Sequence, residues 1–445
     1  MAGTILLLWL PISGFSQYEY EIGVEARGYL NNDRNPFWFY SNQQGMVSPE
    51  TQAMGLLDGH YRRYLGDYFE IEAGGSLFLD FTDGGDTQIR ANEYYATLGW
   101  NVLRFTAGAR ARPERLLGIS SVNGDVIWSN NARAIPGVEL YTVTPFWINR
   151  WLGIEGGMSH YWLNDERYVE DPYIHYKFGA LNFQLSERSL LRFGLEHYAQ
   201  WGGVSPDRGP QPSSFTDFIK IFFGASGGSN ASEPDQANTL GNQLGSWRLK
   251  YQYTLEKGEV SFYFQNLFEN TSGLQLNNFP DGVWGAFWRL PENSPVRGIL
   301  YEYSQTTWLR SSGNRNGENH FNNGTYRSGW TYFERIIGTP FIEFNPDRPA
   351  AINNRFVAHH LGVRAALSKL DMKFMGSHIS YIGSINGTND IPENIIRTQL
   401  LFHYPLGEYA TIGLNLGGDF SDLNDEIFGA GLSFRYALGE TYRMY

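Results

Sequence analysis

The chain has 445 residues, of which 42% are hydrophobic and 16% aromatic, and it contains 51 glycines and no cysteine. Beyond the first few residues it has no run of about 20 apolar residues, which excludes helical membrane spans. The net charge of −12 argues against a nucleic-acid partner, because phosphate binding needs an excess of Lys and Arg. The lack of cysteine excludes disulfides and cysteine-based metal or redox sites.

The first 16 residues have the pattern of a secretory signal peptide. Residues 5–10 are a short apolar stretch, and Gly14 and Ser16 are the small residues expected before a cleavage at Gln17. The basic residues that usually precede such a stretch are missing, so the alternatives are a true start further upstream or the buried start of a soluble fold. We expect a signal peptide over residues 1–16 and one barrel domain over residues 17–445.

Four stretches alternate between apolar and polar residues with a period of two. They are residues 18–27, 69–80, 247–256 and 428–436. Such alternation predicts strands in which every second side chain faces lipid and the others face a polar lumen. In the third stretch we expect Leu249 and Tyr251 to face outward and Lys250 to face inward. Composition alone would also allow a large soluble β-sandwich.

The connections between the expected strands alternate in length. Short turns are predicted near residues 66–67, 101, 149, 187, 257–258, 370 and 405. Longer polar loops are predicted at residues 82–88, 113–135, 164–170, 201–241, 269–297 and 311–323, with a shorter one at 386–393. Short turns at one end and long loops at the other are typical of outer-membrane barrels, in which the turns are periplasmic and the loops extracellular.

This rhythm gives roughly nine hairpins, because the stretch between residues 258 and 370 is long enough for two. The sequence therefore predicts an all-β fold, a transmembrane antiparallel β-barrel of about 18 strands, within a range of roughly 16 to 18. Both termini fall on the short-turn side, so both are expected in the periplasm. Lys257 is expected in the periplasm and Asn293 outside the cell.

The sequence offers few candidates for catalysis or metal binding. Nucleophilic catalysis needs a Ser beside a His and an acid, but the nine His are scattered and no G-x-S-x-G motif is present. Two acidic groups could offer oxygen ligands to Ca²⁺, although acidic loop tips are usually solvated. These groups are Asp83 with Asp86, and Asp419 with Asp422 and Asp425. We expect no enzyme activity, no metal and no cofactor.

Residues 277–289 place large aromatic rings beside amide and carboxylate groups. Asn278 and Asp281 precede Trp284 and Trp288 within the predicted loop 269–297. Sugar recognition uses this pairing, since a ring face packs on C–H groups while planar polar groups bind hydroxyls. Alternatively, the tryptophans lie in the aromatic belt at the membrane interface or pack the loop onto the barrel. This segment alone leaves both interpretations open.

Several segments together resemble the Wzi family of capsule-assembly outer-membrane proteins. The matching segments are residues 35–43, 117–121, 131–137, 193–203, 240–247, 277–285 and 321–330. They span most of the chain beyond residue 16 and keep a plausible order. The resemblance implies a large monomeric barrel of about eighteen strands. It also implies a lectin-like protein, not an enzyme, that helps to hold capsular polysaccharide at the outer surface.

On this basis the leading hypothesis is a non-enzymatic barrel that binds or anchors surface polysaccharide through extracellular loops. The candidate polysaccharide-binding residues are Asn278, Asp281, Trp284, Trp288, Trp201, Asn322, Arg327 and Trp330. The expected partners are capsular or other surface polysaccharide, outer-membrane lipid and the barrel-assembly machinery, with other subunits of an outer-membrane complex as a further candidate.

The alternative function is an outer-membrane pore, or a subunit of an export or assembly complex. The two hypotheses differ in what they expect of the lumen. An occluded lumen with exposed loop aromatics favours the lectin, whereas an open, charge-lined channel favours the pore.

Overall fold

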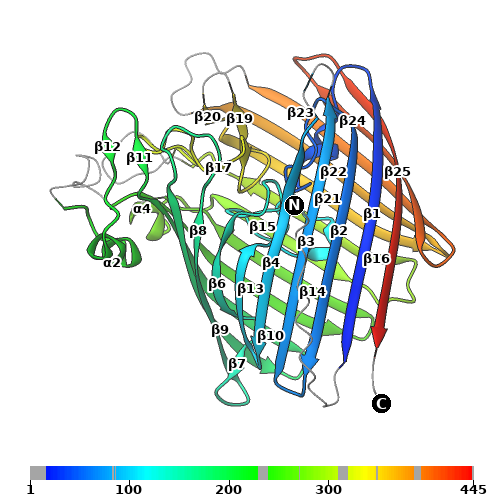
Figure 1. Cartoon of the computed structure of the whole chain (residues 1–445), viewed down its shortest axis with the longest axis horizontal. Coiled ribbons are helices and arrows are strands. Elements are labelled where there is room, and N and C mark those ends of the chain that lie inside the picture. Colours follow the sequence, from blue (N-terminus) through cyan, green and yellow to red (C-terminus); the bar gives the residue numbers. More distant parts are fainter. Residues whose placement is uncertain are drawn as a thin grey trace, which may run out of the picture.

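The computed structural model describes residues 17–82, 85, 87–228, 239–269, 271–308, 319–346, 349–384 and 392–442. The expected signal peptide, residues 1–16, lies outside this part of the chain. The main sheet of the described residues has 19 strands, of which β7 (Phe146–Trp147) pairs only with β8 inside a turn. The other 18 form a closed antiparallel barrel, which confirms the predicted fold (Figure 1).

The barrel strands follow one another around the wall in chain order, and the last pairs with the first. They are β1 (Tyr18–Asn31), β2 (Thr51–Leu65), β3 (Phe69–Thr82), β4 (Ile89–Trp100), β5 (Leu103–Ala109), β6 (Pro136–Thr142), β8 (Leu152–Trp162), β9 (Tyr173–Ser186), β10 (Ser189–Trp201), β13 (Asn242–Leu255), β14 (Gly258–Asn266), β15 (Gly282–Arg289), β16 (Val296–Gln305), β21 (Arg355–Leu367), β22 (Leu370–Gly383), β23 (Glu393–Leu406), β24 (Ala410–Ser421) and β25 (Ile427–Tyr442).

Shorter elements lie in the connections. They are the hairpins β11 (Val204–Ser205) with β12 (Gly209–Pro210), β17 (Thr331–Tyr332) with β18 (Arg335–Ile336) and β19 (Glu343–Asn345) with β20 (Ala350–Ile352), the helices α1 (Phe37–Tyr40), α2 (Phe215–Phe223) and α4 (Thr271–Leu274), and a 3₁₀ turn, Leu116–Gly118. Among the described residues, no helix is both long and apolar enough to cross a bilayer.

The two faces of the wall follow the period-two pattern of the sequence. On β13, Leu249 is 44% exposed on the outside, whereas Lys250 lies beside Arg192 and Tyr263 on the inner face. Tyr251 pairs with the exposed Phe262, so it also faces outward, as expected. Closure lets every wall strand pair on both edges, which a bilayer requires because it offers no water to backbone polar groups.

Opposite charges meet on the inner face, between neighbouring strands or across one intervening strand. Arg62 on β2 binds Glu72 on β3 at 2.7 Å and Glu19 on β1 at 2.9 Å. Arg192 on β10 binds Glu155 on β8 at 2.8 Å. A polar, charge-paired lumen wall beneath an apolar exterior is the arrangement of outer-membrane barrels.

The two ends of the barrel differ, as the turn lengths predict. Short turns gather at the lower end in Figure 1, where the backbones of Tyr18 and Tyr442 pair and both ends of the barrel sheet therefore lie. The exposed rings of Trp100, Trp147 and Trp151 form part of an aromatic belt at this end. The longer connections lie at the opposite end, which we call the long-loop end.

The predicted loop 269–297 was wrong in its second half. It contains strand β15 and a turn, residues 290–295, that joins β15 to β16 at the short-turn end. Asn293 therefore lies at the same end as Lys257, and not outside the cell as expected. The predicted loop 311–323 lies largely outside the described residues, but the connection that contains it extends from β16 to β21.

Three long connections fold back into the barrel at the long-loop end: residues 32–50, 110–135 and the described part of 306–354. Glu302 on the inner face of β16 accepts hydrogen bonds from the hydroxyls of Ser120 and Ser121, both at 2.6 Å. His360 on β21 donates to the carbonyl of Ile119 at 2.8 Å, and the backbone N–H of Phe37 donates to Asp419 on β24 at 3.0 Å. These contacts place the main hydrophobic core inside the lumen.

Candidate functional site

Trp284 and Trp288 lie on the outer face of β15. Val283 and Phe287, which directly precede them, are buried on the inner face, and side chains alternate between the two faces of a strand. The Trp284 ring is 4.1 Å from the ring of Phe264 and its indole N–H donates to the carbonyl of Pro280 at 3.2 Å. Trp288 is 39% exposed near the short-turn end. The expectation that both lie in an extracellular loop was wrong, and their geometry fits the alternative of a membrane-interface belt.

Asn278 and Asp281 are buried and hold the connection between β14 and β15 together. The Asn278 amide donates to the carbonyl of Leu267 at 2.5 Å and accepts from Asn266 at 3.0 Å. Both carboxylate oxygens of Asp281 accept the N–H of Trp308 at 3.0 Å. Burial raises the pKa of Asp281 to about 6. Both side chains therefore stabilise the loop from within.

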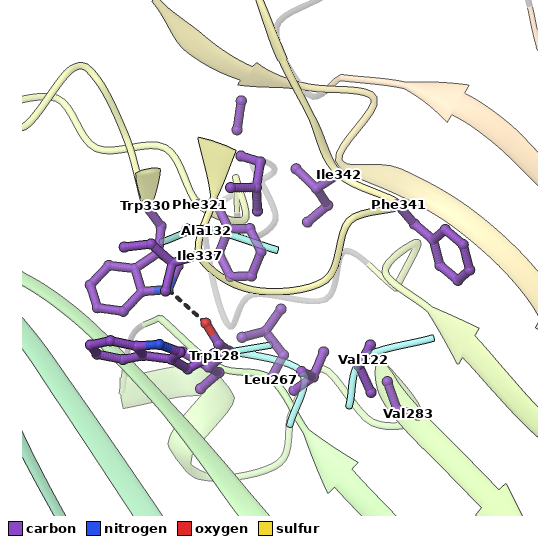
Figure 2. Close-up of a cluster of buried hydrophobic side chains, with 14 of the residues drawn as sticks. Val122, Trp128, Ala132, Leu267, Val283, Phe321, Trp330, Ile337, Phe341 and Ile342 are labelled. Atoms are coloured by element: carbon purple, nitrogen blue, oxygen red, sulfur yellow. Dashed lines mark hydrogen bonds between the residues drawn. The ribbon is translucent and has the colours of Figure 1, made fainter. Parts of the chain in front are cut away.

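Trp330 is fully buried in the lumen core (Figure 2). Its indole N–H donates to the carbonyl of Ile127 at 2.7 Å, and its ring lies 6.3 Å from that of Trp128 and 5.7 Å from that of Tyr198 on β10. This side chain joins the connection 306–354 to the connection 110–135 and to the barrel wall.

Two further predicted residues have packing or hydrogen-bonding partners within the protein. Trp201 ends β10 on the outer face, nearly buried among the rings of His160, Tyr173 and Phe218 at 5.5 to 5.8 Å. Asn322 donates to the carbonyl of Ala351 at 2.7 Å and accepts its N–H at 2.9 Å.

Arg327 is the predicted residue with an exposed side chain at the long-loop end. Its guanidinium lies 4.6 Å from the ring centre of Tyr168 and donates to Asp207 at 2.7 Å, and its side chain is 50% exposed. Arg208 lies next to Asp207 and donates to Thr325 at 3.3 Å. We call Tyr168, Asp207, Arg208 and Arg327 the loop-tip patch. The structure does not bring the eight predicted residues together into one site.

The loop-tip patch carries its charges in a defined arrangement. A hydrogen bond from the Ser205 hydroxyl, at 2.7 Å, is the main cause that lowers the pKa of Asp207, and Tyr168 and Arg327 contribute. Desolvation and the hydrogen bond to Asp207 raise the pKa of Tyr168. At neutral pH the patch therefore presents a carboxylate and a phenol, which can bind sugar hydroxyls, and guanidinium groups, which can bind sugar hydroxyls or carboxylates.

The connection 110–135, against which Trp330 packs, is fixed to the barrel by buried charges. Asp125 in the connection 110–135 lies 3.3 Å from Arg112 and 3.4 Å from Arg248 on β13. Burial opposes ionisation of Asp125, but Arg248, Arg112 and Arg115 hold its pKa below the usual value. The Arg112 guanidinium also lies 4.7 Å from the ring centre of Trp128. Paired buried charges of this kind fix the position of a loop because removing either partner is costly.

Two of the acidic residues considered for Ca²⁺, Asp419 and Asp422, have other partners. Asp419 accepts the N–H of Phe37, and Asp422 accepts the N–H of Asn394 at 2.9 Å. Asp83 and Asp86 lie outside the described residues. Within the part of the chain that the structure describes, no three His, Asp or Glu side chains are gathered as a metal site.

A family profile described as capsule assembly protein Wzi matches residues 17–347. Among solved structures, the chain is similar to Wzi of Escherichia coli, described as an outer-membrane protein involved in group 1 capsule assembly and a carbohydrate-binding β-barrel. The identity is 15%, the match covers 95% of this chain and 85% of that chain, and the TM-score is 0.61. A likeness at this identity shows the fold.

Other similar structures are OccK5 (OpdH) of Pseudomonas aeruginosa and OccAB4 of Acinetobacter baumannii. OccK5 is 10% identical, with 96% of this chain and 98% of that chain covered and a TM-score of 0.48. OccAB4 is 9% identical, with coverage of 95% and 98% and a TM-score of 0.49. No curated protein sequence matches the chain. From the family match and the closed barrel, this outer-membrane protein belongs to the Wzi family of capsule assembly proteins.

Proposed function

We propose that the chain is a non-enzymatic outer-membrane barrel that binds surface polysaccharide, of the capsular type, at its long-loop end. Family membership and the description of E. coli Wzi as a carbohydrate-binding barrel support the ligand class. The single observation that carries the location is the loop-tip patch, in which Arg327 and Asp207 are exposed beside the Tyr168 ring.

The patch fits an acidic or hydroxyl-rich glycan better than an apolar ligand. Arg327 and Arg208 can bind a sugar carboxylate, and Asp207 can accept from ring hydroxyls. The other predicted residues act indirectly in this proposal. Trp330 and Asn322 hold the connection that bears Arg327, while Asn278 and Asp281 hold the neighbouring loop.

The pore hypothesis is less well supported by the lumen. The connections 32–50 and 110–135 and the described part of 306–354 pack against inner-face residues of the wall at the long-loop end, with Ile119, Ile127, Trp330 and Phe341 completely or almost completely buried. An open, charge-lined channel would favour the pore. Charged side chains do line the inner wall, but folded loops occupy the lumen above them.

A glycan array on detergent-purified protein tests the ligand class, and variants test the location. Arg327→Ala and Asp207→Ala should each weaken binding by about tenfold or more, equivalent to about 1.4 kcal/mol. Arg150→Ala is the matched control, because Arg150 is an exposed arginine in a turn at the opposite end. Absence of any glycan binding by the wild type would refute the function. Full binding by both patch variants would refute only the location.

A further inference from the structure

A row of polar side chains lies on the outer face of β8, β9 and β10, where lipid-facing residues are expected. On β9 the buried Tyr176 and Ala180 face the lumen, so Lys177 and the exposed Leu181 face outward. His160 on β8 and His197 on β10 occupy the same outer face. A lysine on the lipid face of a barrel strand is costly unless something on that face pairs with it.

Helix α2 lies outside the barrel wall (Figure 1), and its residues contact this row. The ring of Phe218 is 5.0 Å from that of His175, and the carbonyl of Phe222 accepts a hydrogen bond from the Lys177 amine. The same amine lies 2.8 Å from Nδ1 of His197. The hydrogen-bond partners of the Lys177 amine are thus a carbonyl and an imidazole, and in the described part of the chain no carboxylate neutralises its charge.

The other side of α2 is apolar and faces away from the barrel. Phe215 and Phe223 are 78% and 76% exposed, and Ile219 between them is 41% exposed. Spacings of four residues place these three side chains in one stripe. Since the helix lies against the lipid-facing wall, the stripe is in position to enter the bilayer as an interfacial helix does.

A groove of about 550 Å³ opens on the outer face next to the last turn of α2. Its floor is a cross-strand pair of glycines, Gly156 on β8 and Gly179 on β9. A Cβ added at Gly179 would meet nothing within 4 Å, so this outward position is open space. Its walls are mainly apolar, and its charged group is Lys177. The apolar walls are Leu140, Met158, Leu195 and Phe222.

We propose that this groove binds one molecule of the phosphorylated glycolipid of the outer leaflet, with an acyl chain over the Gly156–Gly179 pair and a phosphate at Lys177. The groove opens toward the bilayer, so an acyl chain reaches it without crossing water. Lys177 lies four residues from Tyr173, where β9 begins at the long-loop end, and nine residues from the other end of the strand at Ser186. That position is in the outer-leaflet half, where the anionic lipid of this membrane carries phosphate.

Native mass spectrometry of the purified full-length barrel tests the proposal. The probes are lipid A, lipid A without phosphates, and phosphatidylglycerol. We expect one lipid A to remain bound to the wild type, with at least fivefold lower occupancy for the other two. Gly179→Leu should reduce lipid A occupancy at least fivefold because it fills the groove. Gly28→Leu is the matched control, since Gly28 is an exposed position on β1 with equally open space.

The variant Lys177→Gln distinguishes a lysine that binds the lipid phosphate from one that only anchors α2. If the groove holds the phosphate, this variant binds lipid A no better than the wild type binds the dephosphorylated form. If Lys177→Gln lowers occupancy but Gly179→Leu does not, the lysine only anchors α2 and the proposal fails. Equal occupancy of Gly179→Leu and Gly28→Leu, or equal binding of phosphatidylglycerol and lipid A, would also overturn it.

Discussion

Replacing Trp330 by alanine should open the lumen without unfolding the barrel. The side chain is fully buried, and its removal leaves a cavity beside Trp128 and Tyr198 and an unpaired carbonyl at Ile127. Truncation of a buried tryptophan costs about 3 to 5 kcal/mol. Because the lost contacts join loops to each other and to Tyr198 on the inner face, and none of them pairs one wall strand with another, we expect the cost to fall on loop packing. A loss of about 3 kcal/mol raises the population of displaced loops by about a hundredfold or more.

Conductance of single barrels in planar bilayers measures this opening. Trp330→Ala should show larger or more frequent conductance steps than the wild type. Trp330→Phe, which keeps a buried ring but loses the hydrogen bond, should lie between them. Heat-dependent mobility on gels checks that all three barrels are folded. If the folded alanine variant conducts exactly like the wild type, Trp330 does not hold the loops in the lumen.

Three further predictions concern the wall, the topology and one buried acid. Leu249→Arg should destabilise the barrel by about 2 to 4 kcal/mol in urea titrations if it lies near the midplane, and Lys250→Gln much less; equal damage would contradict the two-faced wall. Tags at Lys257 and Asn293 should both stay unlabelled on intact cells, whereas a tag at Asp207 should be labelled; a labelled Asn293 would contradict the strand β15. The raised pKa of Asp281 means that the folded protein binds a proton at this carboxyl more tightly than the unfolded protein does. The contribution of Asp281 to the free energy of unfolding is therefore fully present below its ordinary pKa and is lost as pH rises toward about 6. Hydrogen exchange of residues 267–281, corrected for the intrinsic rise of the exchange rate with pH, should therefore speed up across that window in the wild type and change less in Asp281→Asn.

The wall strands were predictable because lipid and lumen impose alternation on every one of them. Residues 247–256 show it so clearly that the faces of Leu249 and Lys250 followed from the sequence. Strand β15 was not predicted because it has only eight residues and follows a stretch rich in Asn, Pro and Gly. Trp284 and Trp288 were assigned to sugar binding, although their spacing of four places them on one face of a strand.

The filling of the lumen was not predictable in the same way. Phe37, Trp38 and Phe39 form a buried apolar run, and such a run indicates a core. Which core it joins depends on closure of the wall, since α1 packs against β23 and β24 from the far end of the chain. The segments that resemble the family contain many of these lumen residues. The resemblance therefore singled out these stretches of sequence but did not show that they pack inside the barrel.

The loop-tip patch depends on the same packing that fills the lumen. Tyr168 and Asp207 come from connections that flank β9 and β10, which are neighbours in the wall. Arg327 comes from the connection after β16, which β13, β14 and β15 separate from β10. It reaches Asp207 because Trp330, three residues further on, is fixed inside the barrel mouth. No local pattern could have predicted that meeting. It follows that loosening the lumen loops should also separate Arg327 from Asp207, so the proposed glycan binding and the occlusion of the lumen would be lost together.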